Sequence, residues 1–478
     1  MATQSTAQWS SRFAFIMAAV GSSVGLGNLW RFSSEAGTNG GGAFIMVYLA
    51  AVFFVCVPVL LSEYLVGRSG SYANAVNSLS EVAEKSGRSP AWQFASWVGM
   101  IAGFLIVTFY CVIAGWVVKY VWLMMTDAFS GMSPDAVAQS FFDFGASPMQ
   151  VLPWFLAFAL LTTWLVSRGV NKGIELAARL LMPAFFALLL ALAIYSVFAG
   201  LESGATQKAL SFLYVPDVNE MLTKNPDASK FANFGSVANA ALGQAFFSVG
   251  VGSAIMITYG SYIPKGVSLP NSAVIVAIMD TLVALIAGLA IFPIVFASGL
   301  SESAGPSLLF ITLPNAFETM GAIGPILGAA FFFLAFFAAI TSSTSLLEPS
   351  AAFASERLNI SKSKAAWIVG ALMILIGLIS VFGVGLNEKN QLVTPALDAI
   401  DGFTGKVMLP TAGFLIVLFV GWRVKKSILE EQLAGPGNGL GRAIIFLTRY
   451  IAPIFVGIVM VSSIYGYVTG FFPSPPAT

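Results

Sequence analysis

The sequence predicts an all-α integral membrane protein with eleven transmembrane helices. Hydrophobic residues make up 57% of the 478-residue chain and charged residues only 9%, whereas a soluble domain carries about a quarter of its residues as charges. Apolar segments that reach the length needed to cross the hydrocarbon core, about 20 residues, recur along the whole chain. The segments are approximately 13–35, 42–67, 92–126, 151–168, 174–200, 236–263, 271–299, 322–356, 363–386, 393–423 and 443–472. We expect residues 1–478 to form a single transmembrane domain, because no segment resembles a linker between soluble domains.

Basic residues on the connections predict how the bundle is oriented. Of the 23 Lys and Arg residues, 16 fall on one side of the predicted membrane and 5 on the other. Cytoplasmic connections carry the excess of positive charge, so the N-terminus is predicted to be cytoplasmic. An odd number of spans then places the C-terminus outside. No cleavable signal peptide is expected, since the polar start MATQSTAQWSSR leads directly into the first span.

Composition also excludes several classes of function. A net charge of +1 without a dense basic run argues against nucleic-acid binding. The chain has no histidine, so the usual catalytic base and the commonest metal ligand are both missing, and we predict that it is not an enzyme. Cys56 and Cys111 lie in apolar stretches without metal-ligand spacing and are expected to pack as small hydrophobes. An ion channel would need a continuous pore and often a symmetric filter loop, and neither pattern is evident.

The first span is predicted to break between Gly21 and Asn28. Three glycines and two serines fall within these eight residues, and each glycine weakens a helix by up to about 1 kcal/mol relative to alanine. Freed backbone carbonyls can coordinate a cation, and freed amides can hold a carboxylate. Close helix packing through small residues is the alternative. The polar residues Asn28, Arg31 and Glu35 follow immediately, and they favour a binding site.

A second break is predicted in the sixth span. Gln244 to Ser253 brings a hydroxyl and two glycines to the same predicted depth. Interrupted helices at equivalent places in two halves indicate a transporter site built on inverted repeats. The two repeats are predicted over about 13–200 and 236–423, with an additional helix at about 443–472.

Polar residues in two further spans extend this site. Thr341 to Ser345 places five consecutive hydroxyls in an apolar segment. Single hydroxyls in helices usually bond back to their own backbone, but five beside a broken helix favour cation ligands. Asp280 is a lone carboxylate in an apolar span and must be protonated, paired or bound to a cation; sodium is its most economical partner. For Glu63 and Lys406, which also lie within spans, we favour structural pairing.

Several motifs together resemble the neurotransmitter:sodium symporter family, and above all its bacterial amino-acid members, the leucine, tryptophan and tyrosine transporters. The agreement covers almost the whole chain. The motifs are GSSVGLGNLWRF followed by NGGGAF at 39–44, Tyr110 and Trp116, GQAFFS at 243–248, TYGSY at 258–262, AITSS at 339–343, and RYIAP at 449–453.

The resemblance implies a five-plus-five inverted repeat that works by alternating access. It implies a sodium-coupled symporter that imports an amino acid across the bacterial inner membrane, with the lipid bilayer as its surroundings and a monomer sufficient for transport. A carrier of an osmolyte or small amino acid such as GABA, taurine, betaine or glycine is the alternative. Tyr110 and Gly25 favour an α-amino acid, whereas the stretch Gly250 to Gly252 leaves the alternative open.

The resemblance also implies site residues. The first Na⁺ would be bound by the Ser23 carbonyl, by Asn28, Ser248 and Asp280, and by the substrate carboxylate. The second Na⁺ would be bound by carbonyls of Gly21, Val24 and Ala338 and by hydroxyls of Thr341 and Ser342. The substrate carboxylate would meet the amides near Leu26 and Gly27 and the Tyr110 hydroxyl, and its ammonium the carbonyls of Ser23, Phe247 and Ser248. The full substrate-binding set is Ser22, Ser23, Gly25, Leu26, Gly27, Ile106, Tyr110, Phe247, Ser248, Val249, Gly250, Ser253, Ser342, Ser345 and Leu346.

Departures from the family pattern sharpen these expectations. Gly25 stands where monoamine carriers have an aspartate, which disfavours an amine without a carboxylate. Asp280 replaces the usual asparagine, and Ala284 stands at the chloride-site position. We therefore predict chloride independence, with Asp280 supplying the negative charge. Gly250 and Ser253 replace larger pocket residues, which favours a bulky hydrophobic or aromatic side chain.

Gates are also implied on both sides of the site. Arg31 and Asp401 would form the outer gate, and Phe247 would cap the substrate. Trp9, Tyr262 and Glu356 match the inner gate, but Thr6 replaces its usual arginine, and Arg12 is the candidate substitute.

Overall fold

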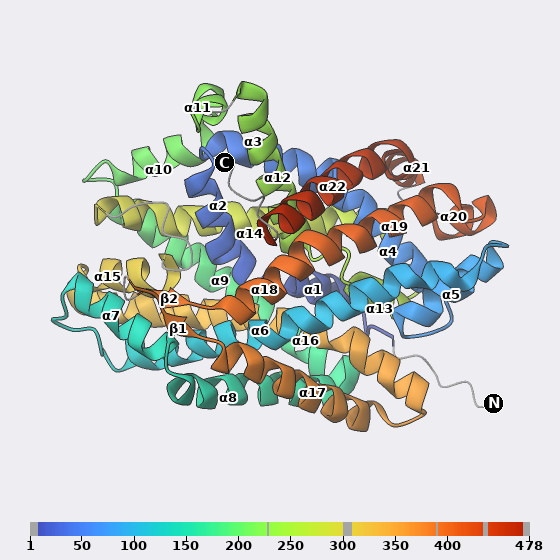
Figure 1. Ribbon diagram of the computed structural model, residues 1–478, viewed down its shortest axis with the longest axis horizontal. Helices are drawn as coiled ribbons and strands as arrows, with labels where there is room; N and C mark the ends of the chain where they lie inside the picture. Colours follow the sequence, from blue (N-terminus) through green and yellow to red (C-terminus); the bar gives the residue numbers. More distant parts are fainter. Residues whose placement is uncertain (1–7, 227–228, 300–307, 389–390, 434–437, 472–478) are drawn as a thin grey trace, which may run out of the picture.

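The computed structural model describes residues 8–226, 229–299, 308–388, 391–433 and 438–471. Within these ranges the chain is almost entirely helical (Figure 1). The regular exception is a two-residue antiparallel pair, β1 (Gly385–Leu386) with β2 (Leu392–Val393). Large apolar side chains such as Leu190, Ile368 and Leu375 are more than half exposed on the outside of the bundle, as expected for helices that face lipid.

Nine helical stretches of the described ranges are long and apolar enough to cross a membrane. Most of the predicted spans are therefore present within a few residues of their expected ends. The stretches are Gly42–Ser69 with α3 (Gly42–Ala51) and α4 (Val57–Ser69), Pro90–Met125 with α6 (Phe94–Met125), α8 (Pro148–Ser167), Val170–Ala199 with α9 (Glu175–Ala199), α14 (Leu269–Ala297), Gly321–Leu358 with α16 (Gly324–Leu358), α17 (Lys362–Phe382), Pro395–Trp422 with α18 (Pro395–Phe403) and α19 (Leu409–Trp422), and Asn438–Tyr467 with α21 (Asn438–Phe446) and α22 (Ala452–Phe471).

The first span is broken where the glycines predict it. Helix α1 (Arg12–Ser23) begins at the cap residue Ser11, whose hydroxyl accepts from the Ala14 amide. The chain is extended at Val24 and resumes as a π-helical turn, Gly27–Arg31, that leads into α2 (Phe32–Thr38). The two parts meet at an angle of 54°, and as one bent span they bring the number of candidate spans in the described ranges to ten.

The predicted span 236–263 is also two helices, α12 (Lys230–Val249) and α13 (Ile255–Ser261). Gly250 and Gly252 between them have φ of +72° and +79°, and Ala254 has φ of +62°. Positive φ is easy for glycine and strained for alanine, so the glycines account for the end of α12. This pair is not among the ten candidate spans, and the count of eleven stays a prediction.

Helix packing places the two breaks next to each other at the centre of the bundle. Helix α1 packs on α9, α14 and α16, and α16 packs along α6.

Helix α13 packs closely on α4: a Cβ on Gly67 would lie 2.0 Å from the Ile257 carbonyl oxygen, and one on Gly260 would lie 2.9 Å from the Tyr64 carbonyl oxygen. These helices therefore meet backbone to backbone.

Short helices cover the two ends of the bundle. The end that carries Trp9, here called the N-terminal side, has α5 (Ala75–Lys85), α20 (Lys426–Leu433) and α21, on the right of Figure 1. The opposite end, here called the vestibule side, has α7 (Pro134–Gly145), α15 (Leu313–Glu318) and the strand pair, on the left of the figure. The connection between α9 and α12 forms α10 (Ala205–Tyr214) and α11 (Val218–Thr223).

Candidate functional site

A buried carboxylate cluster lies where the two broken helices meet α14. The Asn28 side-chain amide donates to Asp280 Oδ1 at 2.8 Å and to Ser248 Oγ at 2.9 Å. Ser248 Oγ lies 3.0 and 2.9 Å from the two Asp280 carboxylate oxygens. All three side chains are at most 1% exposed. The three side chains predicted for the first sodium site are therefore in mutual contact.

Tyr48 on α3 completes this cluster, and the sequence analysis missed it. Its hydroxyl donates to Asp280 Oδ2 at 3.3 Å, and its side chain is fully buried. An aromatic residue in an apolar span is ordinarily a packing residue, so no sequence signal distinguished Tyr48. The hydroxyl of Ser23 faces elsewhere, towards the carbonyls of Ala19 and Val249; its predicted role involves only its carbonyl.

The residues predicted for the second sodium site also come together, between α1 and α16. Ser342 Oγ donates to the carbonyls of Gly21 at 3.3 Å and Val24 at 3.1 Å. Thr341 Oγ1 donates back to the carbonyl of Ala338 at 3.1 Å. Hydroxyl and carbonyl oxygens thus converge at the end of α1.

A cavity of about 50 Å³ lies between the breaks. Twelve of the fifteen predicted substrate-binding residues line this cavity. Its walls are Ser22, Ser23, Gly25, Gly27, Ile106, Tyr110, Phe247, Ser248, Gly250, Ser253, Ile255, Ser342, Leu346 and Leu409. Ile255 and Leu409 were not predicted, because nothing in their sequence context separates them from other apolar residues.

Three predicted substrate residues are not part of these walls. The Leu26 amide donates to the Tyr110 hydroxyl at 3.4 Å, and Leu26 lines the neighbouring vestibule. Val249 offers its carbonyl to Ser23. Ser345 lies outside because α16 turns it towards α13, where its hydroxyl is 2.6 Å from the Tyr259 hydroxyl.

The vestibule is a cavity of about 540 Å³ beyond Phe247. Aromatic residues including Trp30, Phe109 and Trp116 line it, together with the predicted gate residues Arg31 and Asp401. The Arg31 guanidinium lies 4.4 Å from the centre of the Phe247 ring. Among the described residues no ion pair joins Arg31 to Asp401, so the two charges face the same open cavity.

On the N-terminal side, Trp9 closes the bundle against α13. Its backbone amide donates to the Tyr262 carbonyl at 3.0 Å and its indole to the Tyr259 carbonyl at 3.2 Å. Its ring packs edge-on against both tyrosine rings, with centroids 5.1 and 6.0 Å away. Trp9 and Tyr262, both expected at the inner gate, are thus in contact.

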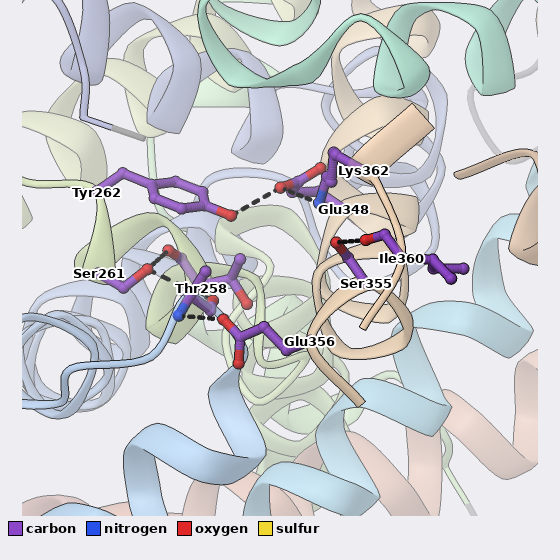
Figure 2. A network of polar contacts seen from close by, with 9 residues as sticks. Thr258, Ser261, Tyr262, Glu348, Ser355, Glu356, Ile360 and Lys362 are labelled. Carbon is purple, nitrogen blue, oxygen red and sulfur yellow. Dashed lines mark hydrogen bonds and ion pairs between the residues drawn. The ribbon is translucent and has the colours of Figure 1, made fainter. Parts of the chain in front are cut away.

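A second cluster on this side joins α13 to α16 and α17, and the sequence analysis missed two of its members. Tyr262 donates to Glu348 Oε1 at 2.8 Å, and Lys362 Nζ lies 2.7 Å from the same oxygen (Figure 2). Glu348 has no exposed side-chain surface. Tyr262, Glu348 and Lys362 are called the Glu348 cluster below. Glu348 could have been singled out from sequence, because it is a carboxylate within the predicted span 322–356.

Glu356, also expected at the inner gate, lies close enough to Tyr262 for their charges to interact. Its carboxylate accepts from the Ala73 amide at 2.7 Å and from the Asn74 side chain, just before α5. Arg12 is exposed and has no ion pair in the described ranges, while Thr6 lies outside them. The only ion pair of the described residues that joins α16 to α17 is therefore Glu348 with Lys362.

Glu63 has a defined partner as well. Its Oε1 accepts from the Gly252 amide at 2.9 Å. Glu63 thus anchors the chain between α12 and α13, and the structural role favoured for it agrees with this contact.

Comparison with known proteins identifies the family. The family model of the sodium:neurotransmitter symporter family matches residues 6–138 and 137–473. The chain belongs to this family. The family consists of sodium-coupled transporters and not of enzymes. With its many apolar helices, the protein is a multi-pass membrane transporter.

Three similar proteins match between 78% and 97% of this chain. The sodium-dependent transporter YhdH of Bacillus subtilis is 34% identical over 469 residues, which cover 97% of this chain and 99% of YhdH. A sodium-dependent nutrient amino acid transporter of Drosophila grimshawi is 26% identical over 424 residues, 78% of this chain and 64% of that protein. The crystal structure of MhsT in complex with L-phenylalanine is 40% identical with a TM-score of 0.83, covering 96% of this chain and 99% of MhsT.

Proposed function

We propose that the protein imports a hydrophobic or aromatic amino acid together with sodium, by alternating access and without chloride. The observation that carries the proposal is the cluster of Asn28, Ser248 and Asp280, of which Ser248 lines the central cavity. A buried carboxylate beside free helix ends is an arrangement that binds a hard cation. The similar MhsT structure holds L-phenylalanine.

Two sodium ions are proposed. The first is bound by the Ser23 carbonyl with Asn28, Ser248 and Asp280, and by the carboxylate of the substrate itself. The second is bound at the end of α1, where Thr341 and Ser342 turn their hydroxyls to bring the oxygen lone pairs towards the ion. A substrate carboxylate that contributes to the first site gives the two ligands a shared, favourable interaction, which is what coupling requires.

The proposed substrate lies along the cavity with its carboxylate at the start of the π-helical turn. The amides near Leu26 and Gly27 and the Tyr110 hydroxyl bind the carboxylate, and the carbonyls of Ser23, Phe247 and Ser248 bind the ammonium. The side chain then lies between Ile106 and Leu346. Gly250 has open space where a Cβ would be, so a bulky side chain fits this end best.

Chloride independence follows from the charge of Asp280. Two sodium ions and a zwitterionic substrate bring two positive charges into a buried site, and a buried charge needs a counter-charge. Asp280 supplies one negative charge, and Tyr48 and Ser248 stabilise it by hydrogen bonds. Ala284, which is fully buried on the same helix, offers no anion ligand.

We propose that the vestibule side faces outwards from the bacterial inner membrane and the N-terminal side faces the cytoplasm. The excess of basic residues on the N-terminal side supports this orientation. The two broken spans support the two inverted repeats, at about 13–200 and 236–423. A single copy holds all the residues proposed for the site, so a monomer suffices.

Uptake into proteoliposomes tests the proposal. A sodium gradient should drive accumulation of labelled phenylalanine, with competition by leucine and tryptophan but weak competition by glycine, GABA and taurine. Replacing chloride by gluconate should leave the rate unchanged. Asp280→Asn should lower uptake at least about tenfold, as expected for losing an interaction of about 1.4 kcal/mol or more, whereas the exposed Glu84→Gln should not. Strong competition by GABA or taurine favours the osmolyte carrier, and loss of uptake in gluconate refutes chloride independence.

A further inference from the structure

Three exposed aromatic rings gather at the N-terminal side, where α19 ends and α21 leads into α22. Trp422, Phe446 and Tyr450 are 56%, 56% and 44% exposed. The Tyr450 ring centre lies 5.7 Å from that of Trp422 and 5.1 Å from that of Phe446. Exposed tryptophan and tyrosine at the end of a span are typical of the depth at which lipid headgroups lie.

Arginines surround this aromatic group. Arg449 is held in place because its Nε donates to the Gly421 carbonyl at 2.7 Å and its own carbonyl accepts from the Trp422 indole at 2.9 Å. Arg423 follows Trp422 and is exposed. Arg442 is exposed two turns before Arg449, and its Nε donates to Asn438 Oδ1 at 3.0 Å.

These arginines lack negative partners in the described part of the chain. No ion pair is formed by Arg423, Arg442 or Arg449 there. The acidic residues of nearby α20 are engaged elsewhere: Glu430 pairs with Lys426 at 3.4 Å, and Glu431 interacts with Arg68. The site therefore has an excess of positive charge beside an aromatic surface.

An apolar stripe continues from the aromatic group along α22. Ile454, Ile458 and Val461 are 60%, 60% and 62% exposed. They follow Tyr450 at intervals of four, four and three residues, and such spacing places them on one face of a helix. Along α21 and α22, a cation at Arg442 is thus followed by aromatic rings and then by the aliphatic stripe, and the end of α19 adds Trp422 and Arg423 beside them.

We propose that this face binds an anionic phospholipid, with the phosphate between Arg423, Arg442 and Arg449 and an acyl chain along the α22 stripe. The arginines match the phosphate of a phospholipid, the aromatic rings lie at the depth of its headgroup region, and the aliphatic stripe matches its acyl chain. A soluble anion would use only the arginines. Basic pockets between transmembrane helices are known to hold such headgroups. The same lipid would join α19 to α22, and α19 carries Leu409 of the central cavity.

The affinity of the purified full-length protein for phosphatidylglycerol over phosphatidylcholine tests this site. Native mass spectrometry should show preferential retention of phosphatidylglycerol, and Arg423→Gln with Arg442→Gln should weaken it by roughly tenfold or more, since each basic residue near a lipid contributes about 1 kcal/mol. The matched control is Arg357→Gln with Lys364→Gln, two exposed cations on the same side of the molecule, which should retain the lipid.

Fluorescence places the lipid at this face independently of retention. Phosphatidylglycerol with brominated acyl chains should quench Trp422, so that the Trp422→Phe protein loses that part of the quenching. Equal retention in the arginine variant and its control, equal quenching with and without Trp422, or displacement of the lipid by glycerol phosphate alone each overturns the proposal. Neither readout depends on transport, so failure of the proposed substrate leaves this test intact.

Discussion

The two sides of the central cavity are held by charges in opposite ways. On the vestibule side, Arg31 and Asp401 face a cavity of about 540 Å³ without pairing. On the N-terminal side, the fully buried Glu348 receives Tyr262 at 2.8 Å and Lys362 at 2.7 Å. One side is open with its charges hydrated, and the other is closed around a charge removed from water.

This difference predicts which of the two sides resists opening. Removing one partner of a buried ion pair destabilises a structure by about 3–5 kcal/mol, because the remaining charge stays desolvated. Exposed pairs contribute only about 0–1 kcal/mol. We therefore expect opening of the N-terminal side, which would bring water to Glu348, to cost more free energy than closing of the vestibule side.

The largest expected effect comes from Lys362→Met, which leaves Glu348 buried without its cation. We expect the closed N-terminal side to lose about 3 kcal/mol, the lower end of the range because part of Lys362 is exposed. A cysteine introduced as Ser345→Cys should then react with a maleimide roughly a hundredfold faster. Sodium-driven uptake should fall as well.

Lys362→Arg should restore slow labelling, since it keeps the charge, and the exposed Lys364→Met is the matched control. In the Lys362→Met protein, Glu348→Gln should recover part of the closure by removing the stranded charge. Unchanged labelling in Lys362→Met would show that the Glu348 cluster does not hold this side closed.

An intermediate effect is expected for Asp401→Asn on the vestibule side. Asp401 has no ion pair to lose in the open arrangement, so thermal unfolding should change by less than about 1 kcal/mol. Uptake should still slow, because closure over the substrate brings Arg31 towards this position. Thermal unfolding measures the effect on stability and the initial uptake rate measures the effect on transport, both on the same preparation. A stability loss as large as that of Lys362→Met would erase the contrast between the sides.

The smallest effect is expected at Glu81 of α5, on the N-terminal side. Burial raises the pKa of its carboxyl, but hydrogen bonds from Lys85 and Ser71 outweigh burial and hold that pKa below its ordinary value of 4.5. A lowered pKa in the folded state contributes stability above pH 4.5 that is lost as the pH falls through the folded value.

Because the Glu81 side chain is still 22% exposed and its partner Lys85 is 45% exposed, solvent screens the pair, and we expect Glu81→Gln to cost about 0.5 kcal/mol or less at neutral pH. The difference between Glu81→Gln and the unsubstituted protein should shrink as the pH falls below 4.5 and vanish once Glu81 is protonated in the folded protein. Thermal unfolding across this range measures it, and a difference that grows as the pH falls would contradict the assigned hydrogen bonds.

Local features of the chain were predictable from sequence. Hydropathy and glycine content are properties of neighbouring residues, so the break at Gly21–Asn28 and spans such as Gly42–Ser69 follow from them. Asp280 stood out as a lone carboxylate in an apolar span, and the resemblance to the family is what grouped it with Asn28 and Ser248.

Contacts that depend on helix rotation were not predictable. Lys362 reads as one more basic residue on a connection, and only the placement of α17 beside α16 brings it to Glu348. Tyr48 reads as an apolar packing residue until α3 turns its hydroxyl towards Asp280. The contacts of Glu356 with Ala73 and Asn74 were likewise unforeseen, because they depend on how the chain before α5 is placed against α16.

The bare contact between α4 and α13 has a consequence for motion. Gly67 and Gly260 have no side chains, so the two backbones are in direct contact. We expect this contact to resist sliding of one helix along the other. We expect them to tilt as one rigid lever. Any force that frees Tyr262 from Glu348 would then be transmitted along α4 to Arg68, whose guanidinium donates to the Gln432 carbonyl of α20 at 2.7 Å, so that a surface helix reports on the state of the buried site.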